Sequence, residues 1–162
     1  MRSHAPNHIA FIRDDPRRFP SHVLRGSATG LCVFAAEWHG RQDAFWLYEA
    51  GIRATCVDVN GRKLEEMRRI YPDGWEFVEG DAFEFQPTAK YDVITLDPFT
   101  GDTMDRCHRE LAVWCSRANN VVVMGSTAAQ PIYRAPDGWR ITETVHRSDF
   151  GGGVFWTVLR PE

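Results

Sequence analysis

Apolar runs and amphipathic segments alternate along the chain after residue 30. The apolar runs are short and bounded by turn residues, which predicts strands over 31–36, 53–59, 75–78, 91–96 and 120–124. Between several of these runs apolar residues recur at helical spacing, which predicts helices over 40–50, 60–70 and 102–117. Strands and helices that alternate in this way predict right-handed βαβ units, and therefore a parallel sheet with helices on both faces.

The pattern changes toward the C-terminus. Pro131 and Pro136 leave little room for a helix over 126–138. Two further apolar runs follow at 139–145 and 154–159, and the Gly-rich segment between them is too short for a crossover helix. These two runs therefore predict an antiparallel hairpin. The predicted fold class is α/β: a doubly wound, seven-stranded, mostly parallel sheet with a C-terminal antiparallel β-hairpin.

The composition agrees with one ordinary domain. The chain has 162 residues, of which 43% are hydrophobic and 25% charged, and this balance excludes a disordered, collagen-like or coiled-coil protein. We expect a single α/β domain over 31–162, preceded by a basic N-terminal extension over 1–30. The extension is the most basic stretch of the chain and contains Arg13, Arg17, Arg18 and Arg25.

Charge and cysteine usage narrow the possible partners. The formal net charge is −3, so a nucleic-acid partner would have to meet a local basic patch. No apolar run approaches the length of a membrane helix, and the N-terminus has no apolar core of a signal peptide, so we expect a cytoplasmic protein without membrane contact. Four cysteines without a metal-binding spacing predict reduced thiols and no metal site.

Three acids follow successive predicted strands, where an open parallel sheet binds its ligands. Asp58 ends the second strand, 18 residues after Gly40, and an acid there can accept both hydroxyl hydrogens of a ribose. Asp81 follows the third strand in a Gly-Asp-Ala turn, and Asp97 follows the fourth and precedes Pro98. Each acid also has a simpler interpretation, as a capping residue or as a strand-ending aspartate before a turn.

This order of acids, together with the seven strands and the terminal hairpin, resembles the class I S-adenosylmethionine (SAM)-dependent methyltransferases over roughly residues 31–160. The resemblance implies SAM as the cofactor and no metal. It places Asp58, Val59, Asp81 and Ala82 among the cofactor-binding residues, with Asp81 accepting the exocyclic amine of the adenine.

The segment Asp97-Pro98-Phe99 resembles the (Asp/Asn)-Pro-Pro-(Tyr/Phe) motif of nucleic-acid amino-methyltransferases, and more closely the Asp-Pro-Phe form of some tRNA guanine N2-methyltransferases. The resemblance implies catalytic roles for all three residues. A carboxylate and a rigid carbonyl can accept the two hydrogens of an exocyclic amine and orient its lone pair, while an aromatic face stacks the base. Thr100 and Gly101 follow, so the second proline of the common motif is missing.

The first loop departs from the family pattern Asp-x-Gly-x-Gly-x-Gly. It reads Phe34-Ala35-Ala36-Glu37-Trp38-His39-Gly40. In a gapless overlay Ala36 takes the first glycine position and Gly40 the third, while Phe34 stands at the position of the acid. Glu37 is the remaining acid of the loop and could reach the methionine ammonium only from a distorted loop. If it does not reach this group, we expect weak binding of the cofactor.

The sequence thus predicts a SAM-dependent methyltransferase that N-methylates a nucleobase amine or another amine. Two alternatives stay open: a non-catalytic binding or scaffold subunit of the same fold, and a small-molecule methyltransferase in which Phe99 and Trp38 wall the pocket. His39 could act as a general base or simply be solvated. A chain of this size would need a partner subunit, a dimer or its basic extension to recognise a specific nucleic acid. A NAD-binding Rossmann domain is disfavoured because no G-x-G-x-x-G occurs.

Overall fold

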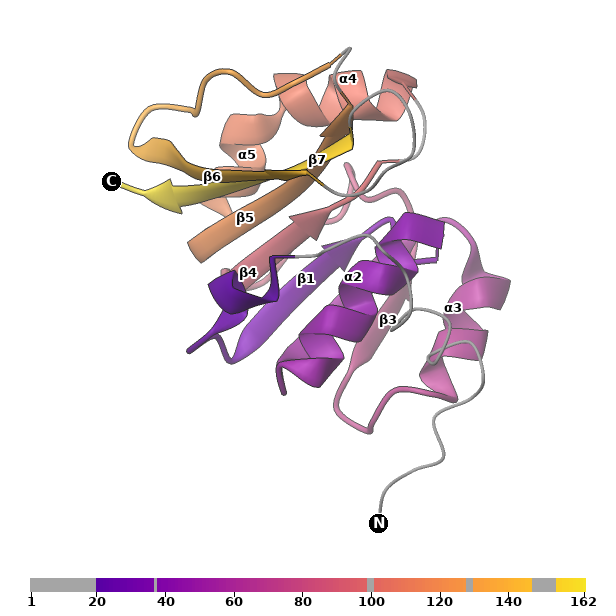
Figure 1. The fold of residues 1–162 in the computed structure, drawn as a ribbon. Coiled ribbons are helices and arrows are strands. Elements are labelled where there is room, and N and C mark those ends of the chain that lie inside the picture. Colours follow the sequence, from indigo (N-terminus) through magenta and orange to yellow (C-terminus); the bar gives the residue numbers. More distant parts are fainter. Residues whose placement is uncertain (1–19, 37, 99–100, 128–129, 147–153) are drawn as a thin grey trace.

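The computed structural model describes residues 20–36, 38–98, 101–127, 130–146 and 154–162. One seven-stranded sheet organises them, with the strand order β3-β2-β1-β4-β5-β7-β6 (Figure 1). The strands are β1 Thr29–Val33, β2 Arg53–Asp58, β3 Glu76–Glu79, β4 Tyr91–Leu96, β5 Ala118–Thr127, β6 Trp139–His146 and β7 Val154–Pro161. The first five run parallel, and β7 pairs antiparallel with both β5 and β6. The predicted fold class, including the terminal hairpin, is confirmed.

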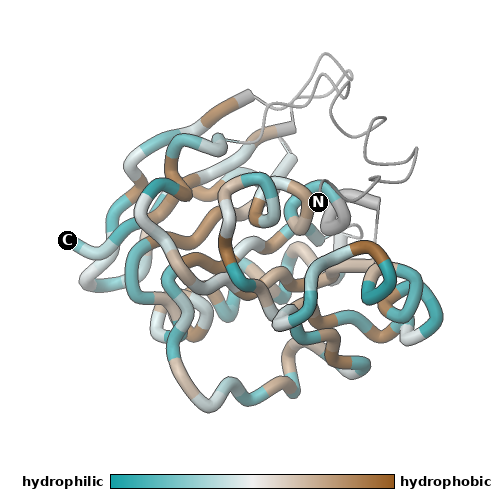
Figure 2. Tube along the Cα trace, turned by 90° about the horizontal axis from the view of Figure 1, so that it is seen from below, coloured by the Kyte–Doolittle hydropathy of each residue, from teal (hydrophilic) through white to brown (hydrophobic). Residues whose placement is uncertain are grey.

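Helices cover both faces of this sheet. They are the 3-10 turn η1 Ser21–Leu24 and the α-helices α2 Trp38–Glu49, α3 Gly61–Arg68, α4 Gly101–Arg109 and α5 Leu111–Ser116. One buried cluster joins η1, α2 and α3 to one face, and a second joins α4 and α5 to the other. Figure 2 shows many apolar residues toward the middle of the molecule and many polar residues along its outer segments.

Several boundaries differ from the sequence prediction, and β5 is longer at both ends than the expected 120–124. The helix expected over 102–117 is two helices, because Glu110 (φ −98°, ψ 14°) leaves helical geometry between α4 and α5. Strand β1 ends at Val33 rather than at residue 36, since the chain turns at Phe34 with φ 61°. The apolar run continues past the strand because Ala35 and Ala36 are themselves buried in the turn.

The segment between β5 and β6 contains no helix over 130–138, as its two prolines predict. Residues 147–153 of the expected connection and residues 1–19 of the basic extension lie outside the described residues, whereas His146 ends β6. Of the described extension, η1 packs Val23 and Leu24 into the core, a contact that the sequence did not predict.

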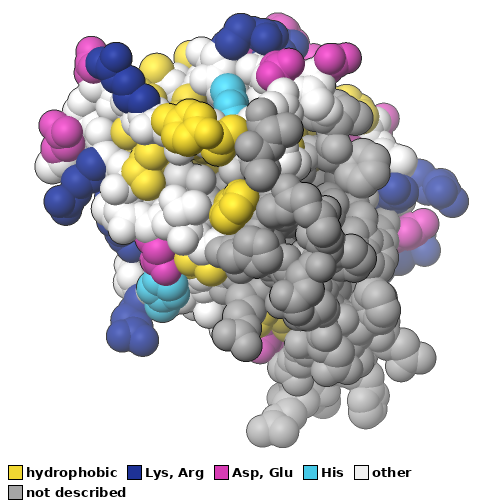
Figure 3. All heavy atoms as spheres, turned by 45° about the horizontal axis from the view of Figure 1, so that its top comes forward, with side chains coloured by type: hydrophobic (Ala, Val, Ile, Leu, Met, Phe, Trp, Pro, Cys, Tyr) yellow, Lys and Arg dark blue, Asp and Glu magenta, His cyan; other side chains and the backbone are white. Residues whose placement is uncertain are grey.

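The outer surface mixes charges of both signs. Figure 3 shows basic and acidic side chains interspersed around small, separate apolar patches on one face. The large apolar side chains exposed among the described residues are Val59, Val113 and Tyr133. Among these residues no helix is long and apolar enough to cross a membrane.

Candidate functional site at the carboxyl edge of the sheet

A pocket of about 430 Å³ opens where the parallel strands end. Its walls come from the ends of β1 and β2, the turn after β3 and the first turns of α4. The lining residues are Phe34, Asp58, Val59, Gly80, Asp81, Ala82, Phe83, Asp102, Thr103 and Arg106. Four residues predicted to bind a cofactor, Asp58, Val59, Asp81 and Ala82, therefore share one cavity.

Asp58 connects two segments of the pocket wall through hydrogen bonds. Its side chain is 3% exposed and accepts hydrogen bonds from two backbone amides, from Ala36 N to Oδ2 at 3.0 Å and from Asn60 N to Oδ1 at 2.8 Å. Asn60 in turn caps α3, because its side chain accepts a hydrogen bond from Lys63 N. The carboxylate thus fastens the first loop to the start of α3, and each of its oxygens keeps a lone pair beyond the one that an amide uses.

Val59 and Ala82 are two of the apolar residues that line the pocket. Val59 is 69% exposed although it follows a buried strand, whereas Ala82 is buried. Val59 therefore leaves an apolar side chain open to water in the wall of the pocket.

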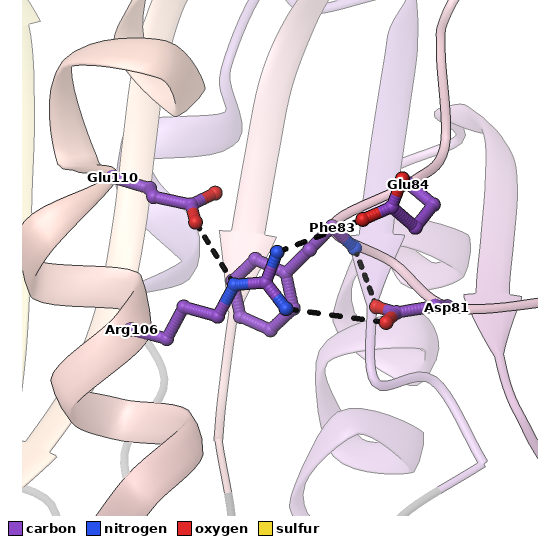
Figure 4. Close-up of polar contacts among 5 residues, drawn as sticks. All are labelled: Asp81, Phe83, Glu84, Arg106 and Glu110. Atoms are coloured by element: carbon purple, nitrogen blue, oxygen red, sulfur yellow. Dashed lines mark hydrogen bonds and ion pairs between the residues drawn. The ribbon is translucent and has the colours of Figure 1, made fainter.

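Asp81 is tied into a charged cluster around Arg106, drawn in Figure 4. Its Oδ1 accepts the backbone N–H of Phe83 at 2.8 Å, which is the turn-capping role that the sequence left open. Its Oδ2 lies 4.0 Å from Arg106 Nη1. The Arg106 guanidinium also lies 4.0 Å from the centre of the Phe83 ring.

Two further carboxylates balance the charge of Arg106. Glu110 accepts a hydrogen bond from Nε at 2.9 Å, and Glu84 Oε1 lies 3.8 Å from Nη2. The hydrogen bond to Glu110, followed by the negative charges of Glu110, Asp81 and Glu84, raises the pKa of Arg106 above its ordinary value. The guanidinium is therefore held over the Phe83 ring as part of a network, and closes one side of the pocket.

Phe34 occupies the position where the family pattern has an acid. It adopts a positive φ of 61°, which costs a bulky residue roughly 1–2 kcal/mol. Its ring lies 5.8 Å from that of Phe83 and lines the pocket. The end of β1 thus contributes an aromatic wall to the pocket instead of a carboxylate.

Asp97 lies one residue beyond β4 and is 1% exposed, and the adjacent Pro98 is also buried. Burial raises the pKa of the Cys32 and Cys107 thiols, and the negative charge of Asp97 adds a smaller contribution in the same direction. Asp97 does not line the pocket that contains Asp58 and Asp81. Pro98 is likewise not among the residues that line this pocket.

Several predicted residues cannot be placed. Phe99 and Glu37 lie outside the described residues, as do the side chains of Trp38 and His39. Gly40 is found in the first turn of α2, which begins at Trp38. Their predicted roles remain predictions.

Sequence reasoning missed Phe83 and Arg106, although both line the pocket. The spacing of Arg106 and Glu110 predicts an ion pair along one helix. Nothing in the sequence indicates that this arginine also reaches Asp81 and Phe83, which follow a different strand. Among the described residues no group of three or more His, Cys, Asp or Glu side chains could hold a metal ion.

Among known protein families, curated sequences and solved structures, only solved structures are similar to this chain. No protein-family model and no curated protein sequence matches the chain. Among solved structures, the N-methyltransferase NodS of Bradyrhizobium japonicum is similar with a TM-score of 0.64 and 14% identity, over 95% of this chain and 92% of NodS. A TehB-like SAM-dependent methyltransferase of Corynebacterium glutamicum has a TM-score of 0.59 and 13% identity, over 88% of this chain and 86% of its own.

A third similar structure is a candidate RNA methyltransferase of Pyrococcus horikoshii. Its TM-score is 0.61 at 14% identity, over 85% of this chain and 76% of that protein. Identities this low establish the fold alone. The chain therefore has the fold of the class I S-adenosylmethionine-dependent methyltransferases.

Proposed function

We propose that this protein is a SAM-dependent methyltransferase that acts on an amine nitrogen. The observation that carries the proposal is the pocket at the carboxyl edge of the sheet, where Asp58, Val59 and Asp81 meet in a methyltransferase fold. Its volume of about 430 Å³ falls in the range of small-molecule sites.

The residues present suit SAM in most respects. Asp58 would accept hydrogens from the ribose hydroxyls, Val59 and Ala82 would contact the adenine ring, and Asp81 would accept its exocyclic amine. When bound, SAM supplies an electrophilic methyl group. Phe34 offers no charge to the methionine ammonium, so we expect weaker binding than an acid at the end of β1 would give.

The proposal also includes the methyl acceptor and the residues that would bind it. The buried Asp97 carboxylate could accept hydrogens of an amine and, through one of its Oδ atoms, take the proton that nitrogen releases on methylation. Pro98 fixes the adjacent backbone and so the direction of its carbonyl. A nucleobase amine suits this pair, because it offers two hydrogens and a ring that Phe99 could stack. The methyltransferases of similar fold include one named for N-methylation and one named as a candidate for RNA, which supports this class of acceptor.

The first experiment measures binding of S-adenosylhomocysteine by calorimetry. We expect a micromolar dissociation constant, because a ribose-binding acid and an adenine contact remain while the charged contact is missing. Absence of binding by the folded protein would overturn the enzyme proposal and favour a non-catalytic subunit of the same fold.

The second experiment follows transfer of a labelled methyl group from SAM to RNA, to DNA and to small amines. Asp97→Asn should lower turnover at least about 100-fold and leave the affinity for S-adenosylhomocysteine within about twofold, because Asp97 acts on the acceptor. Asp73→Asn, in the exposed turn after α3, is the matched control and should change neither quantity. Labelling of small amines without labelling of nucleic acid would overturn the nucleobase assignment.

A further inference from the structure

A second cavity lies at the other end of the strands, on the side of the sheet where β5 begins and β7 ends. It has a volume of about 320 Å³, and its polar walls come from Arg25, Ser27, Asn119, Asn120 and Arg160. No Asp or Glu is among its lining residues. Figure 1 shows the start of β5 and the C-terminal end of β7 on the same side of the molecule.

A third arginine lies beside Arg160 on the neighbouring strand. Arg140 of β6 pairs in register with Arg160 of β7, and residues directly opposite in an antiparallel pair point to the same face. Like charges at such positions destabilise a sheet, and an anion between or beside them removes the penalty. We call Arg25, Arg140 and Arg160 the arginine cluster.

The positive charge of the arginine cluster is not neutralised within the described part of the chain, where none of its members forms an ion pair. Arg160 instead donates a hydrogen bond from Nη2 to Val23 O at 3.2 Å, which fixes its guanidinium against η1. A cation held in place by a neutral carbonyl keeps its charge available to a ligand.

Two acids of this region are already engaged, whereas Glu162, next to the lining residue Pro161, is exposed. Asp92 accepts hydrogen bonds from the backbone N–H groups of Ala28 and Thr29 and from the Asn119 side chain. Glu143, on β6, lies 2.6 Å from His22 Nε2.

We propose that the cavity beside the arginine cluster binds a phosphate group, supplied either by a nucleic-acid backbone or by free phosphate. Guanidinium groups donate paired hydrogen bonds to phosphate oxygens, and the Ser27 hydroxyl and the Asn120 amide add neutral donors. A chain of net charge −3 needs a local site of this kind to hold a polyanion. The inference is independent of methyl transfer, because the ten residues of β5 separate this end of the strands from the other pocket.

The test compares two double variants that remove the same charge. Arg25→Gln with Arg140→Gln removes two members of the arginine cluster and leaves the bond between Arg160 and Val23 in place. Arg69→Gln with Arg134→Gln removes two exposed arginines that lie elsewhere. The probe is a short fluorescent single-stranded RNA, and its binding is followed by anisotropy over a range of salt concentrations.

We expect the cluster variant to bind the RNA at least about tenfold more weakly than the wild type. Its slope of log K against log salt should fall by roughly 1.4, since each lost phosphate contact contributes about 0.7. The control variant should keep the wild-type slope. Equal losses in both variants would mean a nonspecific charge effect and would overturn the inference for nucleic acid.

Inorganic phosphate distinguishes the second source of the ligand. If phosphate raises the unfolding temperature of the wild type and the control, but not of the cluster variant, while RNA fails to bind, then the site takes free phosphate. If neither probe separates the cluster variant from the control, the proposal is wrong. Binding of S-adenosylhomocysteine should be the same in all three proteins, so a failure of the methyltransferase proposal remains distinguishable from a failure of this one.

Discussion

Asp58 combines two roles in one side chain. Its carboxylate accepts the N–H groups of Ala36 and Asn60, and it also forms part of the pocket wall. A substitution at this position therefore changes the conformation of the wall as well as the groups offered to a ligand. Binding and stability have to be measured on the same variant.

Asp58→Ala should weaken binding of S-adenosylhomocysteine about 10- to 100-fold, because two ribose hydroxyls lose a charged acceptor worth roughly 1.5–3 kcal/mol. It should also lower the free energy of unfolding by about 1–3 kcal/mol, because two backbone N–H groups lose their partner. Calorimetry and urea denaturation measure the two effects. Unchanged affinity in the folded variant would rule out the ribose contact and leave Asp58 a purely structural role.

The burial of the thiols predicts their reactivity in the native protein. Burial raises the pKa of Cys107 and of Cys115 to about 12, and raises that of Cys32 well above its ordinary value. At about pH 8 these groups stay as unreactive thiols, because the thiolate is the nucleophile. A disulfide reagent such as DTNB should therefore modify the native protein slowly and all four cysteines rapidly in urea. Rapid labelling of the native protein would contradict the burial of these side chains.

Between elements, side-chain bonds fix how neighbouring strands begin. Asp92 of β4 accepts hydrogen bonds from Ala28 N at 2.8 Å and Thr29 N at 3.1 Å, and Thr29 Oγ1 accepts one from Asp92 N. The starts of β1 and β4 are thereby joined before the regular ladder begins at Gly30. The hydrogen bond from Ala28, with smaller contributions from Thr29 and Asn119, lowers the pKa of Asp92 below its ordinary 3.8.

A lowered pKa in the folded state means that the Asp92 carboxylate stabilises the fold above its ordinary pKa and loses this effect as the pH falls through the folded value. Asp92→Asn should therefore lower the free energy of unfolding by about 1 kcal/mol at neutral pH, a small value because the group is accessible to water. The difference between variant and wild type should shrink at about pH 3 and below. Urea denaturation at neutral and acidic pH checks both expectations, and a difference that stays constant with pH would contradict them.

At the scale of the whole molecule, β1 lies inside the sheet between β2 and β4, and α2 packs closely on it. A Cβ atom at Gly30 would lie 3.1 Å from Ile52, 3.2 Å from Val93 and 3.3 Å from Leu47. These neighbours come from the residue before β2, from β4 and from α2. The absence of a side chain at Gly30 therefore allows three elements to approach one another.

Gly30→Ala should lower the free energy of unfolding by about 1–3 kcal/mol, because an added methyl group overpacks this junction. Gly101→Ala is the matched control, since a Cβ atom there meets nothing within 4 Å. Thermal or urea denaturation compares the two variants. Equal stabilities would show that the junction adjusts at no cost.

The sequence by itself determined the architecture. Helical and strand periodicity, the short connection before residue 154 and the two prolines after β5 left only a parallel sheet ending in an antiparallel hairpin. The same logic placed Asp58 and Asp81 in one pocket, because parallel strands bring their carboxyl ends to one edge. These features depend on local residue patterns and on the lengths of the connections, and both are visible in the sequence.

The tertiary structure decided the chemistry around those acids. The contacts of Arg106 with Asp81 and Phe83 depend on how α4 packs across the turn after β3, and no local pattern encodes that packing. The pairing of Arg140 with Arg160 depends on the register of β6 against β7, where a shift by one residue would turn either side chain to the other face. Contacts between distant residues are set by the summed packing of whole elements, and for that reason only the folded molecule reveals them.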